Sequence, residues 1–261
     1  MSGAGPADPP GSEAAPVDSE PRRRLAAALR PLITMTVAGL IDDDTVAEAA
    51  DFIEGINARL AEKAGPGRLP RLQPDASRPP QEFFPPSPIT GMINPLAPPL
   101  LIRVVDGVDG GYREIEAEAN FDYPYEGPPT CVHGGVIAET FDEVLGSANM
   151  VAGNPAMTGT LTVRYRKPTP LRTDLRIVAR CLGRDGRKIR TWAGMYHGDV
   201  MTAEAEGIFI EVAPSRFVAI AEGNAEGSDP ATLEVMRAEA ARQGAASDVP
   251  GSLGDQGAAP A

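Results

Sequence analysis

The sequence is poor in the residues on which several classes of protein depend. Of its 261 residues only two are cysteines and two are histidines, so neither a disulfide scaffold nor a histidine-based metal site is expected. Acidic residues outnumber basic ones by 36 to 24. The resulting net charge of −12 argues against general nucleic-acid binding, which needs a basic surface. With so few cysteines, the chain is predicted to belong to the reducing cytoplasm.

Long apolar runs are also missing. The most apolar stretch, residues 25–41, is interrupted by Arg30 and Pro31, so no membrane-spanning helix is predicted. The first 20 residues lack the basic and apolar segments of a secretion signal. No serine elbow, Cys–His pair or metal-ligand spacing occurs, and no cofactor or metal is expected. Hydrophobic residues still make up 42% of the chain, enough to build a core.

Composition and periodicity divide the chain into five parts. Both ends are rich in Pro, Gly, Ala and acidic residues, which is typical of disorder. Apolar residues between the tails recur first with helical spacing and later with strand spacing. The predicted parts are a disordered tail (1–20), a helical extension (21–64), a Pro-rich connector (65–94), the main domain (95–220) and a mostly disordered tail with one short helix (221–261).

The main domain is predicted to be α+β. Two strand-like segments flank "DGVDGG" as a hairpin, and a helix follows from Gly134 to about Met150. Two strands, one long helix and further strands predict an antiparallel sheet with the helix packed on one face. The strands after the helix are expected to form an antiparallel meander of four, at 157–167, 171–182, 188–196 and 200–212.

The segment "CVHGGVIAETFDEVLG", residues 131–146, carries the candidate site. His133 precedes two glycines at the predicted helix start, where unpaired N–H groups and the positive end of the dipole lie. Glycine there lets a substrate oxygen approach the backbone, so Gly134 and Gly135 could hold a developing oxyanion; alternatively, His133 only caps the helix. Asp142 lies on a strip of small residues at the edge of the apolar face. It is a candidate general base, or else a rim residue that contacts water.

These residues carry a family resemblance. "HGG" followed by an acid nine positions after the histidine, with "EGPP" before it and "GTLTVRYRKPTPL" after it, resembles the hotdog-fold acyl-CoA thioesterases. The most similar branch is the phenylacetyl-CoA type, which includes the long-chain thioesterase superfamily members. The resemblance covers about 95–212. It implies an antiparallel sheet wrapped around one long helix, hydrolysis of an acyl-CoA thioester, and a homodimer or dimer of dimers with shared active sites.

The resemblance also implies a role for individual residues. Asp142 falls where the family has its catalytic carboxylate, acting as general base or nucleophile, and Gly134 where a backbone N–H polarises the thioester carbonyl. His133 falls where a side chain orients that region, and Thr158 where a Ser or Thr holds the attacking water. One position departs from the pattern, because several relatives carry an Asn where this chain has Gly127.

The spacing within the helix adds a constraint. Gly134 and Asp142 are eight residues apart, which is about 12 Å along a helix. They cannot both touch one thioester carbon. If both act on the same bond, they must come from antiparallel helices of two subunits.

A basic segment is the candidate site for the coenzyme A end of the substrate. Residues 164–190 contain ten basic and two acidic side chains, a local charge of +8 in an acidic chain. Such a patch can bind phosphates, and Arg166 and Lys167 are the preferred ligands. The alternative is that arginines at alternate strand positions only face solvent. This is expected of at least half of the ten basic residues.

Two other functions are compatible with the sequence. One is a hotdog hydratase or dehydratase acting on enoyl or hydroxyacyl thioesters, which would use a histidine beside an acid within motifs that this sequence lacks. The other is a non-catalytic module that binds acyl-CoA or only dimerises. Gly127 in place of Asn favours that module slightly, whereas Asp142 and Thr158 argue against it.

Overall fold

The computed structural model describes residues 18–39, 41–64, 84–98, 100–107, 111–154 and 156–223, and four single residues further on (234, 237, 238 and 241). The tails predicted to be disordered therefore lie almost entirely outside the described residues, as does most of the Pro-rich connector. The elements in chain order are α1 (Glu20–Ala38), α2 (Asp43–Lys63), β1 (Leu101–Val105), β2 (Glu114–Ala119), the short 3-10 helix η2 (Tyr123–Tyr125), α4 (Gly134–Val151), β3 (Ala156–Tyr165), β4 (Leu175–Asp185), β5 (Lys188–His197), β6 (Val200–Glu211) and α5 (Pro214–Gly223).

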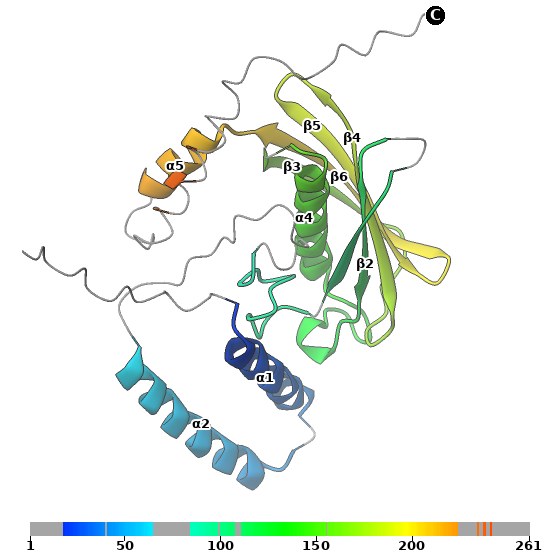
Figure 1. Cartoon of the computed structure of the whole chain (residues 1–261). Helices are drawn as coiled ribbons and strands as arrows, with labels where there is room; N and C mark the ends of the chain where they lie inside the picture. The colour runs from blue at the N-terminus through cyan, green and yellow to red at the C-terminus, as the bar shows by residue number, and fades with distance from the viewer. Residues whose placement is uncertain are drawn as a thin grey trace, which may run out of the picture.

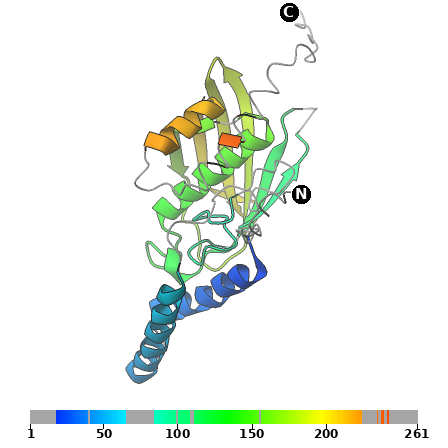
Figure 2. The same ribbon diagram turned by 60° about the vertical axis from the view of Figure 1, so that its left-hand side comes forward.

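A single antiparallel sheet of six strands forms the body of the protein. The strand order is β1-β2-β4-β5-β6-β3. Helix α4 lies across one face of this sheet and contacts β2, β3, β4, β5 and β6 (Figure 1). The turned view shows the same arrangement, with the curved sheet behind the helix (Figure 2). The predicted hotdog architecture is confirmed.

The predicted four-stranded meander is wrong in one respect. β4, β5 and β6 do follow one another through two-residue turns at Gly186–Arg187 and Gly198–Asp199. β3, however, pairs with β6 and not with β4, so it forms the far edge of the sheet. Local alternation of apolar residues identifies a strand, but it does not specify which neighbour the strand pairs with.

The start of β4 also differs from the sequence prediction. The strand begins at Leu175 and not at Leu171, because Arg172 has a left-handed backbone with φ of 54° that interrupts the extended conformation. Leu171 instead donates its N–H to the carbonyl of Thr130 at 2.9 Å. The loop after β3 is thereby tied to the segment that leads into α4.

The core is formed between the helix and the inward-facing side chains of the sheet. α4 buries Ile137, Phe141, Val144 and Leu145, which recur with helical spacing. Burial alternates along β2, β4 and β6, as expected for strands with one face on a core. Several inward positions are small, and Gly207 has no room for a Cβ because Thr191 Oγ1 would lie 2.6 Å away. Small residues therefore let α4 approach the sheet closely.

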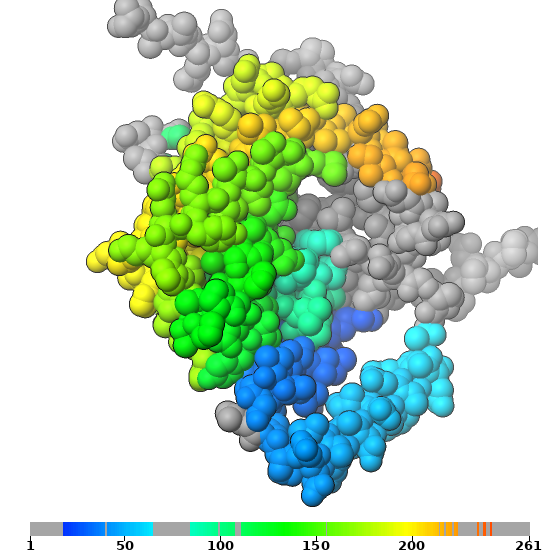
Figure 3. Space-filling model, turned by 180° about the vertical axis from the view of Figure 1, so that it is seen from behind, coloured from blue at the N-terminus to red at the C-terminus, as the bar shows by residue number. Residues whose placement is uncertain are grey.

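The helical extension consists of two helices. Gly39, with φ of 65°, ends α1, and Asp42 caps α2 by accepting a hydrogen bond from the N–H of Thr45 at 2.9 Å. In the space-filling view α1 lies against the body, whereas α2 extends away from it (Figure 3). Within the described part of the chain, no helix is long and apolar enough to cross a membrane.

Candidate active site at the start of helix α4

His133 is the N-cap of α4. Its backbone is extended, its N–H donates to the Tyr125 carbonyl at 2.8 Å, and its Nδ1 accepts the N–H of Gly135 at 3.0 Å. This pairing satisfies one of the unpaired N–H groups of the first turn. The histidine therefore fixes the helix start, and the N–H of Gly135 is used for that purpose.

The N–H of Gly134 remains available. It is the first N–H of the helix, and no acceptor for it is found among the described residues. The Gly134 carbonyl, in contrast, accepts a hydrogen bond from the hydroxyl of Tyr165 at 2.8 Å. A free N–H at the positive end of a helix is suited to an anionic oxygen.

Tyr165 lies beside the candidate site and not in the core. Its side chain lies at the end of β3, is 56% exposed, and reaches across to the start of α4. A Cβ at position 134 would come within 3.3 Å of the Tyr165 hydroxyl. The tyrosine thus holds the backbone around Gly134 in place, a role that no local sequence pattern indicates.

Asp142 and Thr158 come together as the resemblance implies. The Thr158 hydroxyl donates to Oδ1 of Asp142 at 2.7 Å, across sixteen residues of chain. Asp142 is half-buried and Thr158 is exposed. This bond directs one carboxylate oxygen to the threonine and leaves the other free to accept a proton.

A β-bulge helps to position Thr158. The register of β3 against β6 shifts between Thr158 and Thr160, so Gly159 is the extra residue. A Cβ at Gly159 would lie 3.0 Å from the side chain of Ile210, which leaves little room for any other residue. Bulges commonly re-aim a side chain beside a functional site, and here the re-aimed side chain is Thr158.

Gly127, where the resemblance implies an Asn in several relatives, has no room for a side chain. Its N–H donates to the Cys131 carbonyl at 2.9 Å, which folds the loop back toward the N-cap. A Cβ at this position would lie 2.7 Å from the Cα of His133, closer than real Cβ contacts allow. The loop is therefore built for a residue without a side chain.

We expect Gly127→Asn to impair the protein and not to improve it. The added side chain must displace the backbone of His133, so the free energy of unfolding should fall by about 1–3 kcal/mol and the helix start should be disturbed. Urea unfolding measures the loss of stability, and an assay of the acyl-CoA hydrolysis that the resemblance implies measures the disturbance of the helix start. A Gly127→Asn variant that is as stable as the original and more active would contradict this steric explanation.

Glu143, next to the candidate base, is bonded within the protein and does not simply face solvent. Its Oε1 accepts hydrogen bonds from Ser87 at 3.0 Å and Thr90 at 2.8 Å. Both hydroxyl residues are buried. Glu143 thus fixes the loop of residues 84–98 on the side of α4 that faces away from the sheet. The partners come from more than fifty residues earlier in the chain, which explains why sequence spacing did not reveal them.

In the folded protein, acidic side chains of other segments partly neutralise the basic segment. Five of its ten basic side chains form ion pairs with acids of neighbouring segments: Arg164 with Glu206, Arg166 with Glu204, Arg172 with Asp122, Arg180 with Glu114 and Arg184 with Glu211. The hydrogen bond from Arg166 lowers the pKa of Glu204, which keeps that pair charged at neutral pH. Lys167 has no ion pair among the described residues.

Two other side chains are now placed. His197 is exposed at the β5–β6 turn. Trp192 is half-buried on the outer face of the sheet, where the guanidinium of Arg180 lies 4.9 Å from the ring centroid. No cluster of three His, Cys, Asp or Glu side chains within the described ranges is arranged to hold a metal ion.

A sheet wrapped around one helix defines a hotdog protein. The helix carries a free N–H and a carboxylate that pairs with a threonine of β3, which is an enzyme-like site. Comparison with known proteins agrees. The sequence model of the thioesterase superfamily matches residues 130–204, which include the HGG segment, Asp142 and Thr158. The crystal structure of a thioesterase superfamily protein is 30% identical, with a TM-score of 0.63, over 75% of this chain and 96% of that one. The chain belongs to the thioesterase superfamily.

Two curated relatives share part of the domain. The acyl-coenzyme A thioesterase THEM4 of Xenopus laevis is 37% identical over 94 residues, which are 35% of this chain and 42% of that protein. THEM4 of Bos taurus is 32% identical over 96 residues, 36% of this chain and 39% of that protein. The chain therefore spans about two fifths of the length of these relatives.

Proposed function

We propose that the protein hydrolyses an acyl-CoA thioester to a free acid and coenzyme A. The observation that carries the proposal is the pair of groups on α4. The helix has a free N–H at Gly134 and the carboxylate of Asp142, which accepts a hydrogen bond from Thr158. A thioester hydrolase needs both an oxyanion donor and a base or nucleophile. Membership of the thioesterase superfamily and the similarity to the acyl-coenzyme A thioesterases THEM4 support the same activity.

In the proposed mechanism, Asp142 acts as general base. Its free oxygen takes a proton from water, and the water oxygen attacks the thioester carbon. The carbonyl oxygen becomes an oxyanion that accepts a hydrogen bond from the Gly134 N–H. When the carbonyl re-forms, the C–S bond breaks and the coenzyme A thiolate leaves, to be protonated by the carboxyl or by solvent. Direct attack by the Asp142 carboxylate on the same carbon, followed by hydrolysis of the anhydride, is the variant mechanism with the same residues.

The two groups are proposed to come from different subunits. Both lie on α4, about 12 Å apart. β3 is an edge strand of ten residues, and among the described elements nothing pairs with its outer side. Uncovered edges are templates for pairing with another chain. Antiparallel pairing of β3 with the β3 of a second copy would place the two α4 helices side by side, with Gly134 of one near Asp142 of the other. Such a homodimer, or a dimer of dimers, is part of the proposal.

The coenzyme A end is proposed to lie near the exposed end of β3, where Arg166 and Lys167 follow Tyr165. The unpaired Lys167 is the better candidate of the two, because Arg166 already binds Glu204. A cytoplasmic location is part of the same proposal, and the two free cysteines, Cys131 and Cys181, are compatible with it.

Lys167→Ala is expected to raise KM for acyl-CoA about two- to fivefold, the range for an exposed ion pair. Arg166→Ala should have a smaller effect, since Glu204 competes for its charge. Neither variant should affect the hydrolysis of a short pantetheine thioester, which lacks the nucleotide phosphates. Steady-state kinetics with both substrates measure the difference. Equal KM changes with both substrates would show that the basic segment faces solvent and does not bind the nucleotide phosphates.

The proposed function is tested by a thiol-release assay over a panel of acyl-CoAs. Hydrolysis releases a free thiol that reacts with a chromogenic disulfide, whereas a hydratase would consume the double bond of an enoyl-CoA without releasing thiol. A binding module would retain acyl-CoA in calorimetry and turn over none. Thiol release above the background rate supports the proposal, and its absence over the whole panel would overturn it.

A further inference from the structure

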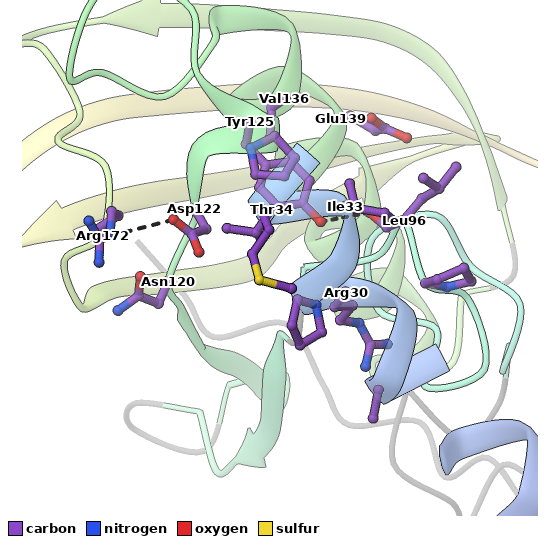
Figure 4. Close-up of a pocket in the computed structure, with 15 residues that line it drawn as sticks. Arg30, Ile33, Thr34, Leu96, Asn120, Asp122, Tyr125, Val136, Glu139 and Arg172 are labelled. Atoms are coloured by element: carbon purple, nitrogen blue, oxygen red, sulfur yellow. Dashed lines mark hydrogen bonds and ion pairs between the residues drawn. The ribbon is translucent and has the colours of Figure 1, made fainter. Parts of the chain in front are cut away.

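A cavity of about 840 Å³ lies beside the start of α4 and does not belong to the site described above. Its walls come from α1, from Pro95 and Leu96, from the η2 segment and from the first two turns of α4 (Figure 4). Cavities of this size are typical of small-molecule sites. One wall is supplied by the N-terminal extension, for which the hotdog architecture itself gives no role.

Arg30 holds the α1 wall in position. Its guanidinium donates hydrogen bonds to the carbonyls of Asn94 at 3.0 Å and Ala97 at 3.1 Å, with a longer one to Met92 at 3.4 Å. These carbonyls belong to the same loop that Glu143 fixes on α4. The cavity is therefore bounded by segments that are bonded to the body, and α1 cannot turn away without losing those bonds.

The polar groups of the cavity are largely used by the protein itself. Arg172 pairs with Asp122 at 3.5 Å, and the hydroxyl of Tyr125 donates to the Leu96 carbonyl at 2.8 Å. Burial raises the pKa of Tyr125 to about 12, so this phenol stays neutral. In Figure 4, Arg30 and Arg172 lie on opposite sides of the cavity.

What the cavity presents to a ligand is mainly apolar. Hydrocarbon surface comes from five of the lining residues: Ala27, Ile33, Met35, Leu96 and Val136. The charged side chains of the cavity are two arginines, Arg30 and Arg172, and two carboxylates, Asp122 and Glu139, so the lining has no net positive charge. A lining without net positive charge does not attract the phosphates of coenzyme A. The lining thus suits the acyl end of the substrate and not its nucleotide end.

The cavity reaches the turn of α4 that carries the proposed oxyanion donor. Val136 lines it and is two residues after Gly134. Tyr125 also lines it, and its carbonyl accepts the backbone N–H of His133, the N-cap, at 2.8 Å. A thioester carbonyl held at the Gly134 N–H would therefore lie close to the cavity.

We propose that this cavity binds the apolar acyl group of the substrate and that α1 sets the preferred acyl length. The inference rests on the proposed function, since it assigns the acyl end of the same acyl-CoA. Each methylene buried in such a cavity is worth about fourfold in affinity. A long acyl chain should therefore bind much better than an acetyl group.

The test replaces one residue of the α1 wall by a bulky one. Thr34→Trp fills the cavity, whereas Thr36→Trp places the same side chain on the same helix at an exposed position outside it. The probes are S-dodecyl-CoA and S-ethyl-CoA, thioethers that cannot be hydrolysed, with binding measured by calorimetry. We expect the original protein and Thr36→Trp to bind the dodecyl probe at least about tenfold more tightly than the ethyl probe. Thr34→Trp should lose most of that preference.

A second variant covers the case in which Thr34→Trp does not fold. Ala27→Phe fills the cavity from another position on α1 and should give the same loss. If the cavity-filling variants keep the full preference for the dodecyl probe, or if the original protein has none, the inference is overturned whatever the hydrolysis assay shows. If the preference depends on Thr34 while no acyl-CoA releases thiol, the cavity assignment stands and the proposed hydrolysis fails.

Discussion

Asp142→Asn is expected to lower kcat for acyl-CoA hydrolysis by a factor of about 10² or more, with KM nearly unchanged. The asparagine oxygen can still accept the hydrogen bond from the Thr158 hydroxyl, which lies 2.7 Å from Oδ1 in the structure. Shape and local contact are therefore kept, and the group that accepts a proton or attacks the carbon is lost. The rate of thiol release at a saturating substrate concentration measures the change in kcat.

The chain offers a matched control for this substitution in the next residue. Glu143→Gln makes the same change of carboxylate to amide on the same helix, and its oxygen can still accept from Ser87 and Thr90. Because Glu143 holds a loop and not the reacting atoms, kcat should change less than about threefold while stability falls slightly. Comparable losses of kcat in both variants would mean that Asp142 has no special chemical role.

Gly134→Pro is expected to lower kcat by a factor of about 10²–10³, the usual cost of losing one oxyanion donor. Proline removes the N–H that has no acceptor among the described residues. The position tolerates the ring, because proline is favoured at the first residue of a helix. The preceding His133 already has the extended backbone, with ψ of 135°, that a following proline requires.

Gly134→Ala separates the lost donor from the added bulk. Alanine brings the same Cβ, 3.3 Å from the Tyr165 hydroxyl, and keeps the N–H. The exposed tyrosine can yield by a few tenths of an ångström, so we expect the alanine variant to keep kcat within about fivefold of the original. If alanine and proline reduce kcat equally, the effect comes from crowding against Tyr165 and the oxyanion role of the backbone N–H is wrong.

The helix and its candidate site positions could be identified because their signals are local. The capping histidine, the glycines at the first turn and the apolar stripe all lie within one short segment, 131–146. The tight turns of the β4–β5–β6 meander were also marked by Asp-Gly and His-Gly pairs in the sequence. The resemblance implied that Thr158 holds the attacking water, and its hydrogen bond to Asp142 was not visible in the spacing alone.

What could not be predicted depends on partners distant in the chain. The edge position of β3 is set by its pairing with β6, some forty residues later. The charge of the basic segment is reduced by acids on neighbouring strands, which a count along the sequence leaves out. The roles of Tyr165 and Glu143 likewise arise from contacts that only the folded chain creates. The sequence therefore indicates the candidate catalytic helix, but not the distant side chains that hold it in position.

The most direct test of the account is complementation between two inactive variants. If one site takes Asp142 from one subunit and Gly134 from the other, a mixed dimer of Asp142→Asn and Gly134→Pro has one doubly damaged site and one intact site. Mixing equal amounts under subunit exchange should then restore up to about a quarter of the original activity, because half of the dimers are mixed and each has one working site. Exchange is confirmed independently with differently tagged subunits. Full exchange without any recovery of thiol release would contradict the shared site between Gly134 and Asp142.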